Sequence, residues 1–553
     1  MHAAIDVMSS ATQSAATPEA PVMIVIGSGP AAIAATKALV ELGHHVTILD
    51  VGTRLEKDRQ EVVERMSHEE PDSWRKEDLS SIIGERSATS ETVHSKLSYG
   101  SSYSFDPRAG AVGVRWAEKQ GFNHSLAKGG LSNVWGSSLL PYRQEDINDW
   151  PVSLDDLIPH YQAVMRFVPG TNFKDGLADI LPSYSDQENT LEPSRQGTAF
   201  LNDLESRKKS LRRSGIFFGR SRLAIRATGD GSRRPCAYCA LCLSGCPYGL
   251  IYSTAQTLDD LIAAGQVKYL ADHLVEKFEM DGSGAVVSGR TLADDAPFSY
   301  RAERVFVGAG VLPTAKIVLN SLGTFDKPIR LVDSQYFIYP LLRAAMIPDV
   351  ETERMHTASQ AFLEIDDRNI SDHLVHLQIY GYSPFLRHEL ERTFLKWPLR
   401  LPAFRRHFLG RLLVAQGFIH SNSSGRVELT LKKTGDGRTC LDARIRRSRD
   451  AFLTTLKVGW KLLKQSLNLR AIPLIPGLKF PNPGSGYHSG GTFPMRHQPG
   501  PLETDLLGRL PGMERIHLVD ASVLPSIPAT SITLSVMANA HRIASIAGRL
   551  EQS

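Results

Sequence analysis

Four of the five cysteines lie within eleven residues, at Cys236, Cys239, Cys242 and Cys246, and a proline follows the last of them. The spacing C-x₂-C-x₂-C-x₃-C-P is that of runs that hold iron–sulfur clusters through thiolates. A structural zinc site usually pairs two separated C-x₂-C knuckles, so this run fits zinc less well. The N-terminus lacks the basic start and apolar core of a secretion signal, which argues against disulfides. The run therefore predicts an iron–sulfur cluster, while Cys440 stands alone and is expected to be buried.

A glycine pattern near the start of the chain predicts a dinucleotide site. The apolar run Val22–Ile26 is typical of a buried parallel strand, and Gly27 marks the sharp turn that ends it. Gly29 lets the backbone approach a ligand closely, and Pro30 suits the first position of a helix because it has no N–H to leave unpaired. Ala32 takes the place of the third glycine of this motif and is small enough for close packing of helix on strand.

The next strand, expected over 45–49, ends in Asp50, whose carboxylate can accept a ribose hydroxyl. The N–H groups at the start of the intervening helix would bind a pyrophosphate. The alternative is a strand–turn–helix that binds no nucleotide. The complete βαβ pattern favours the nucleotide, but it does not distinguish one dinucleotide from another.

Composition indicates a multidomain chain without a membrane span. The 553 residues exceed what one simple core needs, and charged residues make up 22% of them. No run of about 18 apolar residues exists. Residues 1–20 look like a disordered leader, and a net charge of +4 does not by itself imply nucleic-acid binding, so no nucleic-acid partner is expected.

Two stretches are nevertheless basic, Arg207–Arg234 and Arg387–Arg411. The second mixes basic with large apolar residues, as segments that lie on anionic membrane surfaces do. Its prolines, Pro398 and Pro402, predict short helical pieces. The alternative is a solvated rim whose apolar residues fold into the core.

The remaining pattern predicts an α/β protein with an inserted antiparallel domain. Residues 267–270 are strand-like, and residues 304–307 form another apolar strand, which ends in G-x-G before a helical pattern. Between about 331 and 480 the pattern alternates as antiparallel strands do, for example over 362–365, 375–380 and 426–431. We therefore expect a nucleotide-binding domain over 21–330, which includes the cysteine segment 235–247, a substrate-binding domain over 331–480, and a return to the first domain over 481–553.

These blocks, in this order, resemble the glucose–methanol–choline (GMC) flavoprotein oxidoreductases over most of the chain. The resemblance rests on the first glycine motif, the Gly-Gly-Leu-Ser-Asn-Val-Trp loop at 129–135, the G-A-G at 308–310, the Tyr-His-Ser-Gly-Gly-Thr block at 487–492 and the Asp-Ala-Ser-Val-Leu-Pro block at 520–525. It implies a Rossmann-like FAD-binding domain with an inserted antiparallel-sheet substrate domain.

The resemblance also implies FAD as the cofactor and assigns residues to it. Gly27, Gly29 and Ala32 would hold the pyrophosphate, Asp50 the adenosine ribose, and the backbone of Val275 the adenine. The flavin ring would lie along the second glycine loop, near the start of the 520–525 block. The residues implied there are Gly129, Gly130, Ser132, Asn133, Asp520 and Ala521.

Enzymes of this family oxidise alcohols by hydride transfer to the flavin, and the resemblance places the base at His488. An imidazole suits this role because its pKa lies near the working pH. The family carries a second His or Asn on the final helix, and here that place falls on Ser531. A hydroxyl can donate a hydrogen bond to an alkoxide but is no base near neutral pH. The chemistry therefore rests on His488 alone, or the substrate sits differently, or the reaction is not an ordinary alcohol oxidation.

We therefore expect a cytoplasmic FAD-dependent dehydrogenase that oxidises an alcohol on a sugar, polyol or glycan, with an unknown electron acceptor. Some family members with a similar cysteine run carry a cluster that drains electrons from the flavin, whereas others keep cysteines there with no metal known. The basic stretches suggest an anionic or lipid-linked substrate and peripheral contact with the inner membrane face. The alternatives are a reductive or redox-neutral flavin enzyme and a non-catalytic flavin-binding partner protein.

Overall fold

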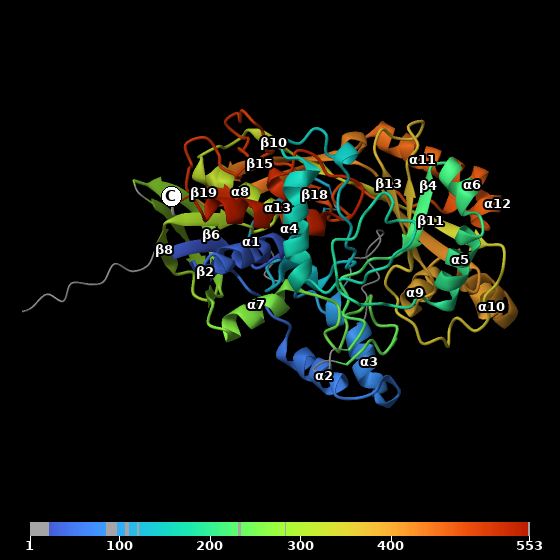
Figure 1. Ribbon diagram of the computed structural model, residues 1–553. Helices are drawn as coiled ribbons and strands as arrows, with labels where there is room; N and C mark the ends of the chain where they lie inside the picture. The colour runs from blue at the N-terminus through green and yellow to red at the C-terminus, as the bar shows by residue number, and fades with distance from the viewer. Residues whose placement is uncertain are drawn as a thin grey trace, which may run out of the picture.

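Five parallel strands, in the order β19-β9-β1-β2-β5, form the sheet that carries the first glycine motif (Figure 1). The computed structural model describes residues 22–84, 97–105, 110–118, 121–229, 234–282 and 284–550; the expected leader at 1–20 lies outside them. Four of the strands begin and end where the sequence predicts: β1 (Val22–Ile26), β2 (His45–Leu49), β5 (Val267–Leu270) and β9 (Arg304–Val307). β19 (Ile516–Leu518) completes the sheet at one edge.

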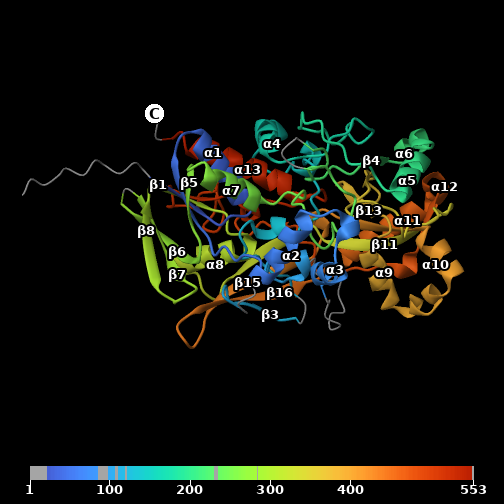
Figure 2. The ribbon, with the colours of Figure 1, turned by 90° about the horizontal axis from the view of Figure 1, so that it is seen from below.

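Helices and a small sheet cover the two faces of this parallel sheet, as Figure 2 shows. On one side, α1 (Pro30–Glu41) packs along the carboxy-terminal helix α13 (Ile532–Ala547), and α4 (Leu154–Phe167) packs on α13. On the other side lie α8 (Val311–Ser321) and the antiparallel sheet of β6 (His273–Asp281), β7 (Gly284–Thr291) and β8 (Pro297–Ala302). Alanines dominate the contact between α1 and α13, so the two helices approach closely.

A second five-stranded sheet, in the order β18-β10-β15-β16-β3, adjoins α8. Its strands are β3 (Val114–Trp116), β10 (Pro328–Asp333), β15 (Arg426–Lys433), β16 (Thr439–Arg446) and β18 (Ser489–Gly490). The boundary expected at residue 330 falls inside β10, and the division of the chain into domains stays a prediction.

The sheet on the substrate side has six antiparallel strands in the order β17-β11-β14-β13-β12-β4. They are β4 (Ile216–Arg220), β11 (Tyr336–Arg343), β12 (Ala361–Ile365), β13 (Val375–Tyr380), β14 (Leu412–Phe418) and β17 (Ala471–Pro473). Around its outer side lie α5 (Arg195–Glu205), α6 (Lys208–Arg213), α9 (Pro384–Glu391), α10 (Pro402–Leu409), α11 (Arg449–Lys464) and α12 (Ser466–Leu469). The predicted α/β architecture with an inserted antiparallel sheet is confirmed.

Shorter elements complete the chain. α2 (Lys57–Ser67) and α3 (Lys76–Ile83) follow the second strand, and α7 (Thr254–Ala263) precedes β5. The basic stretch from Arg387 to Arg411 forms the short helical pieces expected from its prolines, namely α9, two single 3₁₀ turns and α10. Among the described helices, none combines the length and the apolarity needed to cross a bilayer.

Gly27 tests the tight turn after β1. Its φ is +96°, and a Cβ there would meet the carbonyl oxygen of Gly308 at 2.7 Å. Gly43 has a similar φ of +85° but open space around it. We expect Gly27→Ala to lower the free energy of unfolding by about 2–4 kcal/mol, since overpacking adds to backbone strain. Gly43→Ala is the matched control and should cost only the strain, about 1 kcal/mol. Urea unfolding of both variants checks this, and equal losses would contradict the close approach.

Candidate active site

The two glycine loops, about a hundred residues apart in sequence, lie against each other. The N–H of Gly129 donates to Ser28 Oγ at 2.9 Å, and a Cβ on Gly130 would lie 3.0 Å from the Cα of Gly29. Ser28 Oγ in turn donates to Asp50 Oδ2 at 2.5 Å. Ser28 was missed by the sequence reasoning, although its hydroxyl between two motif glycines was a visible signal.

Asp50 lies at the end of β2 as expected, and it is buried. Burial raises the pKa of its carboxyl group to about 6, against the hydrogen bonds from Ser28 and Tyr269 that favour the ionised form. The Tyr269 hydroxyl donates to Asp50 Oδ2 at 3.0 Å. These bonds fix the orientation of the carboxylate.

Helix α1 packs closely on β9 at Ala32, the third position of the glycine motif, as the sequence predicts. A Cβ built on Gly308, at the end of β9, would lie 3.0 Å from the Cβ of Ala32 in α1. The methyl group of Ala32 therefore already fills the space between α1 and β9.

The second glycine loop is held by its own polar side chains. Asn133 Nδ2 donates to the carbonyl oxygens of Lys128 and Gly130 at 2.9 Å, and its Oδ1 accepts from Ser253 Oγ at 2.9 Å. Ser132 Oγ donates to the carbonyl oxygen of Gly129 at 2.5 Å. Both side chains thus shape the loop backbone.

Asp520 joins β19 to the start of α8. One carboxylate oxygen accepts from the N–H of Gly310 at 2.8 Å and from Thr314 Oγ1 at 2.5 Å. The other accepts from the N–H of Ser522 at 3.0 Å. Burial raises the pKa of Asp520, and these donors oppose that rise. The neighbouring Ala521 accepts at its carbonyl oxygen from the N–H of Gly491 at 2.9 Å, next to the block that contains the candidate base.

One cavity of about 490 Å³ connects the glycine loops with the six-stranded sheet. Nine of the predicted site residues line it: Gly27, Gly29, Asp50, Gly130, Ser132, His488, Asp520, Ala521 and Ser531. Four others lie outside its lining: Ala32, Gly129, Asn133 and Val275. Ala32 and Asn133 act through packing and loop geometry, as described, and Val275 lies in β6, so its adenine contact stays a prediction.

The substrate-side wall of the cavity is one face of the six-stranded sheet. The pairing register places Gln378 of β13 opposite Gln416 of β14, and His376 opposite Phe418. The Tyr380 hydroxyl donates to Gln378 Oε1 at 2.8 Å, which leaves the amide NH₂ of Gln378 to donate to a ligand. The wall residues are Tyr336, Ile338, Gln378, Tyr380, Val414, Gln416 and Phe418. Sequence reasoning missed them, although polar residues alternate along 376–380.

His488 is half-buried at the junction between the glycine loops and this wall. Its ring stacks on Phe418 with centroids 4.6 Å apart. Burial, and to a smaller extent His376, lowers the pKa of His488 to about 3. This pKa lies below the value near the working pH that the sequence led us to expect, because most of the ring is withdrawn from water. The neutral imidazole is the form that can accept a proton, and its buried Nδ1 has no hydrogen-bond partner among the described residues.

Ser531 caps the N-terminus of α13 and lines the same cavity. Its Oγ accepts a hydrogen bond from the N–H of Leu140 at 3.2 Å. The hydroxyl proton stays available for donation to an oxygen atom in the cavity.

A buried, hydrogen-bonded carboxylate–imidazole pair lies behind the wall. His376 Nδ1 and Glu364 Oε1 are 2.7 Å apart, and neither side chain is exposed to solvent. Along the sheet, Glu364 of β12 pairs with His376 of β13, which pairs with Phe418 of β14. Burial raises the pKa of Glu364, and the partner His376 opposes that rise. The pair thus supports the aromatic ring on which His488 stacks.

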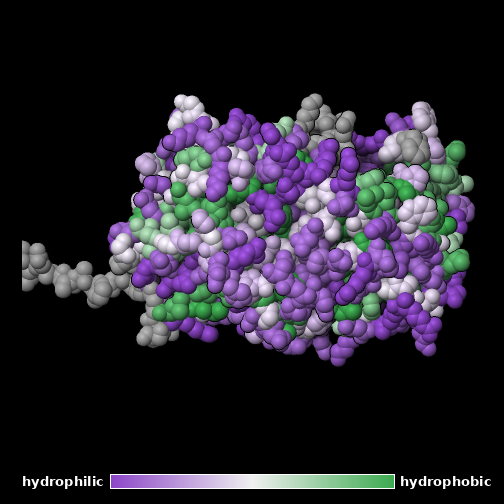
Figure 3. Space-filling view, turned by 90° about the horizontal axis from the view of Figure 1, so that it is seen from above, coloured by the Kyte–Doolittle hydropathy of each residue, from purple (hydrophilic) through white to green (hydrophobic). Residues whose placement is uncertain are grey.

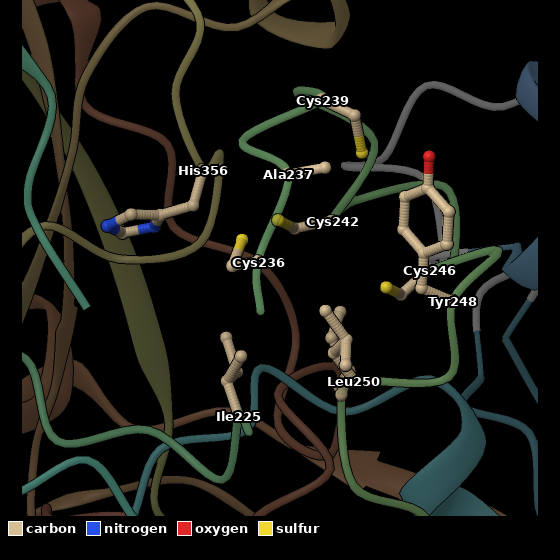
Figure 4. Close-up of a pocket in the computed structure, with 10 residues that line it drawn as sticks. Ile225, Cys236, Ala237, Cys239, Cys242, Cys246, Tyr248, Leu250 and His356 are labelled. Atoms are coloured by element: carbon tan, nitrogen blue, oxygen red, sulfur yellow. The ribbon is translucent and has the colours of Figure 1, made fainter. Parts of the chain in front are cut away.

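The four clustered cysteines line a separate small apolar cavity (Figure 4). None forms a disulfide. Among the residues that the structure describes, no group of three or more His, Cys, Asp and Glu side chains is placed to hold a metal ion. Burial raises the pKa of Cys236 and of Cys239 to about 12, so metal-free thiols there stay protonated. The predicted cluster is thus not supported by the positions of the thiols, although the four come together.

Comparison with known proteins finds a match to the GMC oxidoreductases in the carboxy-terminal part of the chain. Residues 421–540 match the family model described as GMC oxidoreductase. They contain His488, Asp520 and Ser531. The family resemblance drawn from the sequence is thereby confirmed. No curated protein sequence matches the chain.

Solved structures share the fold over nearly the whole chain. Pyridoxine 4-oxidase from Mesorbium loti is 14% identical with a TM-score of 0.55, covering 95% of this chain and 98% of its own. A formate oxidase is 12% identical with a TM-score of 0.59, covering 97% and 100%. A variant of formate oxidase from Aspergillus oryzae, solved to study the effect of a mutation on FAD modification, is 12% identical with a TM-score of 0.56, covering 96% and 98%.

Glu364→Ala tests the buried carboxylate–imidazole pair. We expect it to lower the free energy of unfolding by about 3–5 kcal/mol, because it leaves a buried histidine without its partner. Glu279→Ala, which removes the exposed pair with Lys277, is the control and should cost less than about 1 kcal/mol. Urea unfolding measures both, and a similar small loss in the two variants would rule out a stabilising role for the pair.

Proposed function

We propose that the protein is an FAD-dependent oxidoreductase that oxidises a CH–OH group by hydride transfer to flavin N5. The observation that carries the proposal is the single cavity that runs from the glycine loops to His488 and the polar sheet face. A general base, a hydroxyl donor and a wall of hydrogen-bonding side chains meet at its inner end. The family match over residues 421–540 supports the same chemistry.

The residues present fit FAD. Gly27 and Gly29 leave the backbone without side chains just before the N-terminus of α1, in a space that a side chain would fill. The bare backbone and the helix N-terminus both suit a pyrophosphate. Asp50 would accept from the ribose, Val275 would contact the adenine, and Asp520 and Ala521 would lie near the ribityl chain and the pyrimidine. When bound, the flavin supplies the hydride acceptor.

His488 takes the hydroxyl proton of the substrate. The neutral ring is ready for this because burial lowers its pKa, and the stack on Phe418 fixes its orientation. Ser531 donates a hydrogen bond to the substrate oxygen, which stabilises the developing alkoxide. This arrangement keeps one base and one donor, where the family carries a second His or Asn.

The wall favours a substrate rich in hydroxyl groups, such as a sugar, polyol or glycan. Gln378, Gln416 and Tyr380 present amide and phenol groups that match hydroxyls in both donor and acceptor roles. We propose a dehydrogenase rather than an oxidase, with an acceptor other than O₂. The solved neighbours are named as oxidases. Measuring dye reduction and O₂ consumption in the same assay therefore distinguishes a dehydrogenase from an oxidase.

His488→Asn tests the base. We expect kcat to fall by about 10²–10⁴ in a dye-coupled assay over a panel of sugars and polyols, because the variant lacks a proton acceptor. In the parent protein, His488 stays neutral, so its protonation should cause no loss of kcat/KM between pH 8 and 5. The matched control is His517→Asn, another buried histidine of lowered pKa, which lies outside both this cavity and the cysteine cavity. Full turnover by His488→Asn would favour a different chemistry. No turnover of any compound by the parent protein or by the variant would favour a non-catalytic flavin-binding partner.

The same variant tests the burial of the ring through stability. The folded pKa of about 3 lies below the usual 6.5, so the unfolded state binds the extra proton and stability is lost as the pH falls below 6.5. Removing the imidazole should reduce the slope of the unfolding free energy against pH by about 1.4 kcal/mol per pH unit between pH 6 and 4. An unchanged slope in urea unfolding would show that His488 is protonated normally.

We further propose that Cys236, Cys239, Cys242 and Cys246 hold an iron–sulfur cluster that takes electrons from the flavin. The spacing and the shared apolar cavity support this. Leu243, between Cys242 and Cys246, lines the active-site cavity, and that position would suit a one-electron relay and an acceptor other than O₂.

Iron and acid-labile sulfide analysis of anaerobically purified protein tests the cluster. We expect both elements in the parent protein, their loss in Cys242→Ser, and their retention in the control Cys440→Ser, whose thiol lies outside the cavity. Protein with bound flavin but no iron would refute the cluster and leave the oxidation itself untouched. The reductive or redox-neutral alternative predicts flavin that substrate alcohols never reduce.

A further inference from the structure

The far end of the six-stranded sheet carries an unusual share of exposed apolar side chains. Figures 1 and 2 both place α5, α6, α10, α11 and α12 at this end, away from the glycine loops. Of the twelve large apolar side chains exposed in the described residues, eight lie here, so the clustering is not a general property of the surface. We name this group the distal apolar face: Trp397, Leu401, Phe404, Phe452, Leu453, Trp460, Leu467 and Ile472.

One stripe of α11 and α12 alternates apolar and basic residues. Leu453, Lys457, Trp460, Lys464 and Leu467 follow one another at spacings of four and three, which places them on one side of the helix. Trp460 is 56% exposed and Leu467 is 87% exposed. Tryptophan and lysine together are typical of side chains at a membrane interface, where the ring sits among the head groups and the ammonium reaches the lipid phosphates. Figure 3 shows apolar surface among hydrophilic residues at this end.

The helices on this end are held together by one short segment of backbone. The carbonyl oxygen of Ala344 accepts from Arg411, just after α10, and the N–H of Ala344 donates to the carbonyl oxygen of Arg470, just after α12, at 2.8 Å. Ile347 N–H donates to the carbonyl oxygen of Gly410 at 2.9 Å. The segments that follow α10 and α12 are therefore held close to each other.

The charge of this surface is positive. The chain contains no Asp or Glu from 392 to 427 and none from 451 to 502. Lys396, Lys457 and Lys464 are exposed and have no carboxylate partner among the described residues, and the guanidinium of Arg400 lies over the Trp397 ring at 4.4 Å. Three acidic groups nearby are already paired, Asp349 with Arg406, Glu351 with Arg387 and Arg405, and Asp203 with Arg343 and Arg470.

We propose that the distal apolar face docks on the surface of an anionic lipid bilayer. Apolar side chains would enter the head-group region while the lysines contact lipid phosphates, the combination that holds amphipathic helices on membranes. A nucleic acid would not account for leucine, isoleucine and phenylalanine side chains exposed without polar partners.

One segment of the chain carries both a wall of the active-site cavity and part of the docking face. Ser383, Phe385 and Leu386, at the start of α9, line the cavity, and the chain runs from there through the two 3₁₀ turns to Trp397 and Leu401. The proposal does not depend on the reaction, and a head-group substrate would be presented beside the cavity.

Sedimentation with vesicles tests the docking. The full-length protein is mixed with vesicles of phosphatidylcholine alone and with vesicles in which about a third of the lipid is phosphatidylglycerol. We expect binding to the anionic vesicles at least tenfold stronger than to the neutral ones, and weakened by added salt because the lysines are exposed. Absence of binding to anionic vesicles overturns the proposal. Binding of the protein to RNA but not to anionic vesicles is one such result.

Paired variants locate the surface. Trp460→Ser with Leu467→Ser, and separately Lys457→Gln with Lys464→Gln, should each lower vesicle binding by tenfold or more. Matched controls lie at the other end of the molecule: exposed Ile262→Ser for the apolar change, and exposed Lys268→Gln with Lys327→Gln for the charge change. The controls should bind as the parent does, and all variants should keep its circular dichroism spectrum and its turnover of a soluble substrate. Equal losses in variants and controls would show unspecific attraction and overturn the assignment of this face.

Discussion

The site depends on how closely two glycine loops, far apart in sequence, approach each other. Ser28 Oγ accepts from the N–H of Gly129 and donates to Asp50, so one hydroxyl joins the first loop, the second loop and the end of β2. The near contact of Gly29 and Gly130 leaves no room for a side chain on the second loop. Thr254 adds to the junction by donating to the carbonyl oxygens of Ser28 and Gly129. A flat cofactor can lie on backbone there because no side chain intervenes.

Burial then sets the chemistry at the other end of the cavity. A neutral imidazole at His488, stacked on Phe418, is a base without a competing charge. Behind it, Glu364 and His376 contact each other within the sheet, with Oε1 and Nδ1 2.7 Å apart. Gln378 is oriented by Tyr380. The polar wall is therefore preorganised, which is what hydroxyl recognition in a cavity requires.

Local pattern was enough to predict the parallel sheet, because each of its strands is a short apolar run bounded by glycine or charge. β1, β2, β5 and β9 have the bounds expected from sequence. The cavity wall was missed, since Gln378 and Gln416 face each other only through the pairing of β13 with β14, and pairing between distant strands leaves no local signal. The lowered pKa of His488 was missed for a related reason, because the withdrawal of its ring from water depends on Phe418 and on the whole sheet. The spacing in the sequence correctly predicted that the four cysteines lie together, but the positions of the thiols do not show a metal site.

Anaerobic rapid mixing of the flavin-loaded protein with sugars and polyols tests the central claim most directly. Our account predicts that at least one polyhydroxylated alcohol bleaches the oxidised flavin absorption in a single turnover, and that His488→Asn slows this bleaching by about 10²–10⁴. Flavin that stays oxidised with every such alcohol, or that is bleached equally fast in the variant, would contradict it.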